Sequence, residues 1–158
     1  MTGVQTCALP ISSIAVNART LAAIDAELRA ALGAESGAAD PAAQFADLAG
    51  AYLDYAARNR PRWDALFVHR MAGGRRAPEW YQEQQTELFR YLETPLATLC
   101  PGLSAAEIAV LARTLFSAVH GVVSLGLDQK LGPVPPDALR AQARALAASL
   151  ADGVAFRR

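Results

Sequence analysis

Hydrophobic residues along this chain recur every three or four positions. The clearest case is the series Ile14, Leu21, Ile24, Leu28 and Leu32. A helix with 3.6 residues per turn places these side chains on one face, so the spacing predicts an amphipathic helix over 14–32. The alternation with period two that a half-buried strand needs is absent from the sequence. The pattern therefore predicts an all-α protein.

Five further helices are predicted between Gly- and Pro-containing breaks. Asp40 is expected to cap the second helix, with Pro41 in its first turn. Ser104 and Glu107 have the spacing of a capping box, and Pro95 should kink the fourth helix or end its first half. The predicted helices are 14–32, 41–59, a short one that begins at Pro61, carries Trp63, Leu66, Phe67 and Met71 and ends at the Gly73–Gly74 pair, then 78–99, 104–130 and 136–154.

The last two predicted helices indicate self-association. The segment 114–127 is apolar almost all round, so a helix there must be buried on more than one side. The final helix carries leucines on one stripe and small alanines on another, which would allow close helix packing. Two such helices from each of two chains would form a four-helix bundle around a two-fold axis. The predicted homodimer interface consists of Val119, Val123, Ala141, Ala145 and Ala148.

Composition narrows the class of protein. The chain has 158 residues, 53% of them hydrophobic, and a net charge of zero from 15 basic and 15 acidic side chains. This length suits one domain, and the hydrophobic content argues against disorder. A protein that binds nucleic acid by itself normally has a basic excess, so we expect no such binding. Cys100 as the lone cysteine outside the leader fits a reducing cytoplasm, and no uncharged run is long enough to predict a membrane span.

The first eleven residues, Met1–Ile11, match codon for codon the translation of a common sequencing-library adapter. We therefore expect 1–11 to be a non-native leader that packs against nothing, with the native sequence occupying 12–158. A genuine unstructured leader is the alternative. A signal peptide fits poorly, because no basic residue precedes the apolar stretch and Gln5 and Pro10 interrupt it.

The sequence contains no motif that indicates an enzyme. There is no Gly-rich phosphate loop, no nucleophile elbow and no Cys/His spacing suited to zinc. Glu79, Glu83 and Glu87 share a predicted helix face, but no Glu-x-x-His pair accompanies them, so a di-metal site is unsupported. We predict no catalytic residues, no bound metal and no cofactor.

Two segments resemble the C-terminal domain of TetR-family transcriptional regulators. The first is Phe116–Leu125, which contains the pair His120-Gly121, and the second runs from Tyr52 through Trp63 to Phe67. One branch of the family has this His-Gly pair, often with Trp near the position of Phe116. The resemblance implies a helical bundle that dimerises through its last two helices, encloses a small-molecule pocket and follows a DNA-binding helix-turn-helix. Nothing in this chain matches the helix-turn-helix, so operator DNA would be bound only by a full-length parent.

The resemblance also directs attention to an effector pocket between the third, fourth and fifth predicted helices. We expect Trp63, Phe67, Phe116 and His120 to line it, with aromatic rings around a small apolar effector. His120 could donate a polar contact to the ligand, or it could be a core histidine bonded to a backbone carbonyl. Gly121 lies mid-helix, where Gly is unfavourable, so a packing or pocket reason is expected. The alternative function is a helical protein-interaction module without a ligand.

Overall fold

The computed structural model of the chain describes residues 8–33, 40–68 and 77–155, and the described part is all-α, as the hydrophobic spacing predicts. Met71, Gly73 and Gly74 of the predicted third helix lie outside the described residues, as do residues 1–7 and the side chains of 8–13. The expectation that the leader packs against nothing falls there too. The helices are α1 (Ala8–Leu32), α2 (Pro41–Arg58), α3 (Arg60–Val68), α4 (Glu79–Leu99), α5 (Ala105–Leu127) and α6 (Pro136–Ala155).

The predicted capping residues set two of the helix starts. Asp40 accepts a hydrogen bond from the amide of Ala42 at 3.3 Å, with Pro41 as the first residue of α2. At α5, the amide of Ser104 donates to Glu107 Oε2 at 2.8 Å, and the amide of Glu107 donates to Ser104 Oγ at 3.3 Å. Both orphan donors of the helix terminus are thereby satisfied, and the capping box is confirmed.

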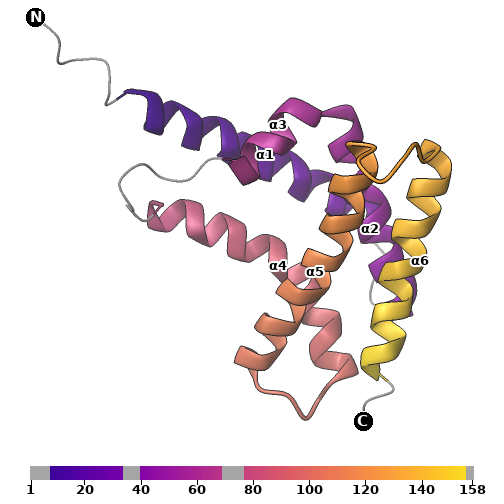
Figure 1. Cartoon of the computed structure of the whole chain (residues 1–158). Helices are drawn as coiled ribbons and strands as arrows, with labels where there is room; N and C mark the ends of the chain where they lie inside the picture. Colours follow the sequence, from indigo (N-terminus) through magenta and orange to yellow (C-terminus); the bar gives the residue numbers. More distant parts are fainter. Residues whose placement is uncertain (1–7, 34–39, 69–76, 156–158) are drawn as a thin grey trace, which may run out of the picture.

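Two helix boundaries differ from the predicted ones, and Pro95 has the effect on α4 that the sequence predicts. α1 begins at Ala8 and not at Ile14. Pro10 is tolerated there because it stands in the first turn, where a backbone N–H would have no partner within the helix. α5 ends at Leu127 and not at Lys130, because Gln129 takes the left-handed backbone conformation, with φ of 53°. α4 continues through Pro95, and Figure 1 shows it changing direction towards its C-terminal end, as expected of a proline kink.

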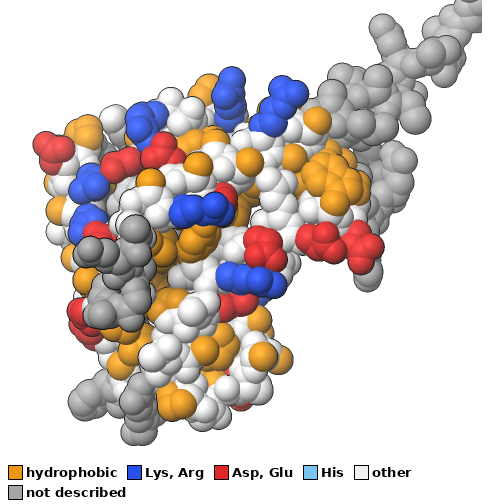
Figure 2. All heavy atoms as spheres, turned by 180° about the vertical axis from the view of Figure 1, so that it is seen from behind, with side chains coloured by type: hydrophobic (Ala, Val, Ile, Leu, Met, Phe, Trp, Pro, Cys, Tyr) orange, Lys and Arg blue, Asp and Glu red, His pale blue; other side chains and the backbone are white. Residues whose placement is uncertain are grey.

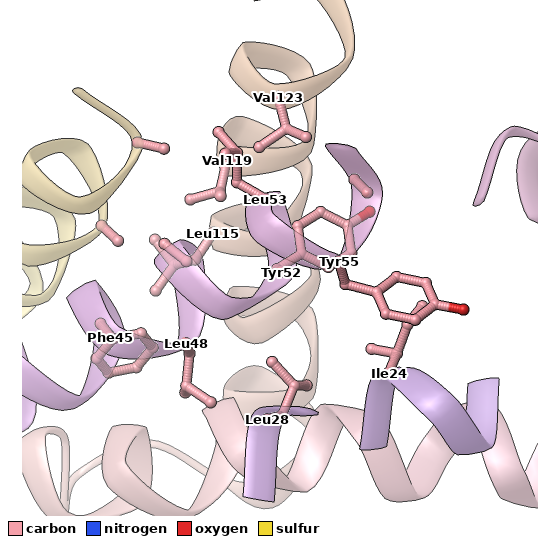
Figure 3. Close-up of a cluster of buried hydrophobic side chains, with 14 of the residues drawn as sticks. Ile24, Leu28, Phe45, Leu48, Tyr52, Leu53, Tyr55, Leu115, Val119 and Val123 are labelled. Atoms are coloured by element: carbon pink, nitrogen blue, oxygen red, sulfur yellow. The ribbon is translucent and has the colours of Figure 1, made fainter. Parts of the chain in front are cut away.

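The helices pack around α2. The most extensive contact is between α2 and α6, with α1 crossing α2 and with α4 and α5 closing the remaining side (Figure 1). Figure 3 shows the buried side chains of α1, α2 and α5 converging, with Leu28 of α1, Leu48 and Leu53 of α2, and Leu115 and Val123 of α5 in one cluster. This arrangement places α1, α4 and α5 around a cavity beside α2.

Small residues bring α2 and α6 close together. The buried positions of the seam are Ala46, Ala49 and Gly50 on α2 and Ala143, Ala147 and Ala151 on α6. Two ion pairs bridge its outer edge: Arg140 Nε lies 3.0 Å from Asp54 Oδ2, and Arg144 Nη2 lies 2.8 Å from Asp47 Oδ1. A Cβ atom at Gly50 would stand 3.0 Å from Arg144 Nη1, so the glycine provides room for this side chain.

Candidate ligand-binding cavity

A cavity of about 430 Å³ lies between α1, α2, α4 and α5, with α3 and α6 at its edges. This volume is in the range of small-molecule sites. Its wall is mostly leucine and phenylalanine, which offer apolar surface and no hydrogen bonds. The apolar lining residues are Leu21, Ile24, Leu28, Phe45, Leu48, Ala49, Leu66, Phe67, Leu88, Phe89, Leu92, Leu115, Phe116, Val119, Ala147 and Leu150.

The polar lining groups lie mainly on one side, on α4 and α5. Gln82, Gln85 and Thr86 of α4 and Arg113 of α5 contribute them, and all four are exposed to solvent. Tyr52 and Tyr91 are the other polar residues of the lining. The cavity is therefore an apolar chamber whose opening carries hydrogen-bonding groups, an arrangement suited to a ligand with an apolar body.

Tyr91 links two walls of the cavity. Its hydroxyl donates to Asp25 Oδ1 of α1 at 2.7 Å, and Asp25 Oδ2 in turn accepts from Arg29 Nη2 at 2.8 Å. Burial raises the pKa of Tyr91 above its usual value. The phenol therefore stays protonated near neutral pH and acts as a fixed tie between α4 and α1.

Of the four residues predicted to bind the ligand, Phe67 and Phe116 line the cavity, while Trp63 and His120 lie behind its wall. All four belong to one aromatic cluster around Tyr52. The His120 ring centroid is 4.2 Å from that of Phe67, 5.1 Å from that of Trp63 and 5.6 Å from that of Phe116. The structure thus brings the predicted residues together, but gives only two of them direct access to the chamber.

His120 bonds to a side chain and not to the backbone carbonyl considered above. Its Nδ1 lies 2.9 Å from the hydroxyl of Tyr52, which does line the cavity. Burial raises the pKa of Tyr52 well above its usual value, and burial lowers the pKa of His120, so both groups are neutral near neutral pH. His120 therefore positions the Tyr52 hydroxyl at the cavity wall.

Trp63 packs beside Tyr52 and His120. Only 1% of its surface is exposed, and its indole Nε1 has no hydrogen-bond partner among the described residues. The Trp63 ring packs against the Tyr52 ring, with centroids 5.9 Å apart, and so helps to hold the Tyr52 side chain in place.

Sequence reasoning missed most of the cavity wall. Tyr52 belongs to one of the segments that resemble the TetR family, but the sequence does not indicate that it is the partner of His120. Arg113 gave no signal, because a single Arg on an amphipathic helix has the pattern of an ordinary solvated residue. The contribution of α1, through Leu21, Ile24 and Leu28, was indistinguishable from core packing.

Comparison with known protein families identifies the architecture. A model described as the Tetracyclin repressor-like C-terminal domain matches residues 45–150, from α2 into α6. The chain belongs to this family. This match confirms the expected TetR-type C-terminal domain, and the family is a regulatory, non-enzymatic one. No curated protein matches the chain.

The TetR-like domain presents an open face on α5. Val110 is 66% exposed and Leu125 is 40% exposed, and the hydroxyls of Thr114 and Ser117 donate back to carbonyls of their own helix. A hydroxyl bonded in this way contributes little polarity to the surface. Gly121 lies on this helix with no atom within 4 Å of where a Cβ would stand. Within the described part of the chain, no packing contact therefore accounts for Gly121.

The five predicted interface residues divide into two groups. Val123 has no exposed surface and Val119 has 9%, so both belong to the core of the protomer itself. They offer almost no area to a partner, because Leu115, Val119 and Val123 form the side of α5 that faces α2 (Figure 3). Ala141 and Ala145 are exposed on α6 and Ala148 is half-buried. An interface would use these alanines and the open face of α5.

Charge distribution, helix hydropathy and the placement of metal-ligating side chains bear on possible partners. Over the face shown in Figure 2, Lys and Arg side chains are interspersed with Asp and Glu and do not gather into one basic patch. By length and composition α5 alone among the described helices could cross a membrane, a test that core helices of soluble proteins also pass. Among the described residues, no group of three His, Cys, Asp or Glu side chains is placed to hold a metal ion.

Proposed function

We propose that this chain is the effector-sensing and dimerisation domain of a TetR-family transcriptional regulator, acting in the cytoplasm on a small, largely apolar effector. The observation that carries the proposal is the cavity of about 430 Å³, walled by apolar side chains from α1, α2, α4 and α5 of a TetR-like C-terminal domain. Phe67, Phe116 and the Tyr52 hydroxyl held by His120 supply aromatic contact and one orientable hydrogen bond.

We propose homodimerisation through α5 and α6. The supporting features are the exposed Val110 and Leu125 of α5, with the half-buried Gly121 on the same helix, and the exposed Ala141 and Ala145 of α6. Small residues let helices from two protomers approach closely. The isologous arrangement that results would bury these faces around a two-fold axis.

The effector is proposed to act by moving α5 relative to α1. Leu21, Ile24 and Leu28 of α1 and Leu115 and Phe116 of α5 line the same cavity, so an occupant contacts both helices at once. In a full-length regulator α1 would connect to the DNA-binding unit, and its displacement would change the spacing of the two DNA-reading heads. Such a difference in contacts between two states is what allostery requires.

The wider proposal is that the chain is a fragment of that regulator. Residues 1–11 would be an adapter-derived leader, and the DNA-binding domain of the full-length parent would precede residue 12. This fragment, with zero net charge, should not bind operator DNA with sequence preference. A gel shift of the fragment against random and operator duplexes tests the statement, and a sequence-specific shift would refute it.

The dimer is tested by Ala145→Glu with sedimentation equilibrium. A carboxylate without a partner in the desolvated dimer interface costs about 3–5 kcal/mol, so the dissociation constant of the dimer should rise by more than a hundredfold. Ala97→Glu, at an exposed position of α4, is the matched control and should leave the dimer intact. A wild-type protein that sediments as a folded monomer at micromolar concentration would overturn the dimer.

The cavity is tested by screening small apolar compounds for thermal stabilisation. A hit should bind more weakly to Leu92→Trp, which adds an indole ring to the chamber wall, and to His120→Leu, because the Tyr52 hydroxyl loses its partner. If no compound stabilises the wild-type protein and the dimer persists, the ligand-free interaction module is the better reading.

A further inference from the structure

The cavity wall carries a single formal charge. Among the described residues that line the chamber, Arg113 is the only Asp, Glu, Lys or Arg. The remaining polar lining consists of two glutamines, one threonine and two tyrosines, all neutral groups. A cationic ligand would find no carboxylate in the lining, and an ion without a partner is costly to remove from water. The charge of the wall is thus of one sign only.

Arg113 lies at the boundary between the apolar chamber and solvent. Its guanidinium carbon is 4.5 Å from the centroid of the Phe89 ring, and its side chain is 47% exposed. The Phe89 ring packs edge-on against Phe116, with centroids 5.6 Å apart, and both rings line the cavity. The planar cation is therefore stacked on the last aromatic residue of the wall, with its edge available to a group at the cavity opening.

The hydrogen bonds of Arg113 leave part of its donor fork free. Both recorded bonds use Nη1, which donates to the Ala109 carbonyl at 2.7 Å and to Glu93 Oε1 at 3.3 Å. Within the described part of the chain, Nε and Nη2 have no recorded partner. At 3.3 Å, the bond to Glu93 is longer than the roughly 2.7–2.9 Å that is usual for a hydrogen bond between charged groups. Glu93 therefore competes only weakly with a ligand for Arg113.

We propose that the effector is an apolar molecule with one carboxylate at its end. This inference rests on the proposed function of the cavity. The hydrocarbon or aromatic body would occupy the leucine- and phenylalanine-lined chamber, and the carboxylate would accept hydrogen bonds from the free edge of Arg113 at the opening. The Gln85 amide, on the same side of the opening, would donate a further hydrogen bond. Glu93 would oppose the ligand's charge and moderate its affinity.

The test compares three ten-carbon probes by isothermal titration calorimetry with the intact chain: decanoate, 1-decanol and decylamine. The buffer is slightly alkaline, so the acid is fully ionised. Their apolar bodies are matched, so differences in affinity report the end group. Decanoate should bind about tenfold more tightly than decanol, the value expected for a hydrogen bond to a charged group, and decylamine most weakly.

Two variants assign this preference to the proposed pair. Arg113→Gln should weaken decanoate about tenfold and leave decanol unchanged. Glu93→Gln should strengthen decanoate binding several-fold by removing the competing carboxylate. Leu92→Trp should change the affinity of every probe, because Leu92 lines the chamber, and this places the probes inside it. Circular dichroism and thermal melts show that each variant is folded.

Each result discriminates. If decanol binds as tightly as decanoate, or if Arg113→Gln keeps the preference for the acid, the carboxylate inference is overturned and the cavity function stands. A decanoate affinity that is unchanged by Leu92→Trp would place the acid elsewhere and overturn the inference as well. If none of the probes binds wild-type protein, both the inference and the proposed effector cavity fail.

Discussion

The seam between α2 and α6 and the chamber between α1, α4 and α5 are built from opposite kinds of residue. The seam uses alanine and glycine, such as Gly50 and Ala143, so the backbones of α2 and α6 can approach closely. The chamber uses leucine and phenylalanine, whose larger side chains hold the helices apart and do not fill the volume between them. Close packing makes α2 and α6 a firm support, and loose packing leaves α1, α4 and α5 room to respond to an occupant.

The largest effect is expected from Ala143→Leu in the seam. Ala143 has no exposed surface, so three added carbons must push α2 and α6 apart. The free energy of unfolding should fall by about 3 kcal/mol, at the upper end for overpacked cores. Urea denaturation measures it. Ala97→Leu, the same substitution at an exposed helical position, should change stability by less than about 0.5 kcal/mol. Equal effects would mean that the seam is not tightly packed.

A smaller effect separates two glycines of α5. A Cβ at Gly126 would overlap Leu139 Cδ1, so Gly126→Ala must displace this buried leucine of α6. We expect a loss of about 1–2 kcal/mol, because the clash outweighs the gain in helix propensity.

Gly121→Ala provides the contrast to Gly126→Ala. Nothing lies within 4 Å of its Cβ position, so the monomeric protomer should gain up to about 1 kcal/mol of stability from helix propensity. Sedimentation should show weaker dimerisation if Gly121 lies in the α5 interface. Melting curves at low and high protein concentration distinguish the two effects, and a dimer that is unchanged by the substitution would argue against a close approach at Gly121.

The chamber should tolerate added volume that the seam does not. Leu92 lines the cavity and is half-buried, so Leu92→Phe can direct its extra carbons into empty space. The change in unfolding free energy should stay below about 1 kcal/mol. Urea denaturation alongside Ala143→Leu gives the comparison directly, and a loss as large as that of the seam variant would show that the chamber wall is rigid.

The smallest effect is a pH dependence at the edge of the chamber. Burial lowers the pKa of His120 below its ordinary value of 6.5, so the unfolded chain binds a proton more readily than the folded one. Neutral His120 contributes its full stabilisation at pH values above 6.5, its ordinary pKa. This contribution is lost as the pH falls from 6.5 through the lower pKa that His120 has in the folded protein. Denaturation between neutral and mildly acidic pH should show this decline. His120→Gln should flatten it, and an unchanged slope would assign the titration to another group.

The cavity illustrates how far sequence reasoning reached. The residues Trp63, Phe67, Phe116 and His120 are predicted together because the resemblance to TetR-family C-terminal domains implies a pocket between their helices. Their division into two that line the chamber and two that lie behind it followed from rotations of α3 and α5 that no spacing reveals. Val119 and Val123 show the same limit, since an all-apolar helix gives no indication of which face turns inward.

The sequence by itself determined the helices and most of their ends. Those properties depend on local physics: apolar periodicity, the capping side chains of Asp40, Ser104 and Glu107, and the conformational limits of proline. Only the tertiary structure decided that Tyr52 meets His120 across 68 positions of sequence, that Arg113 stands at the opening of an apolar chamber, and that the outer face of α5 is left open. Those properties depend on how helices cross, which is set by side-chain packing over the whole bundle and not by any single segment.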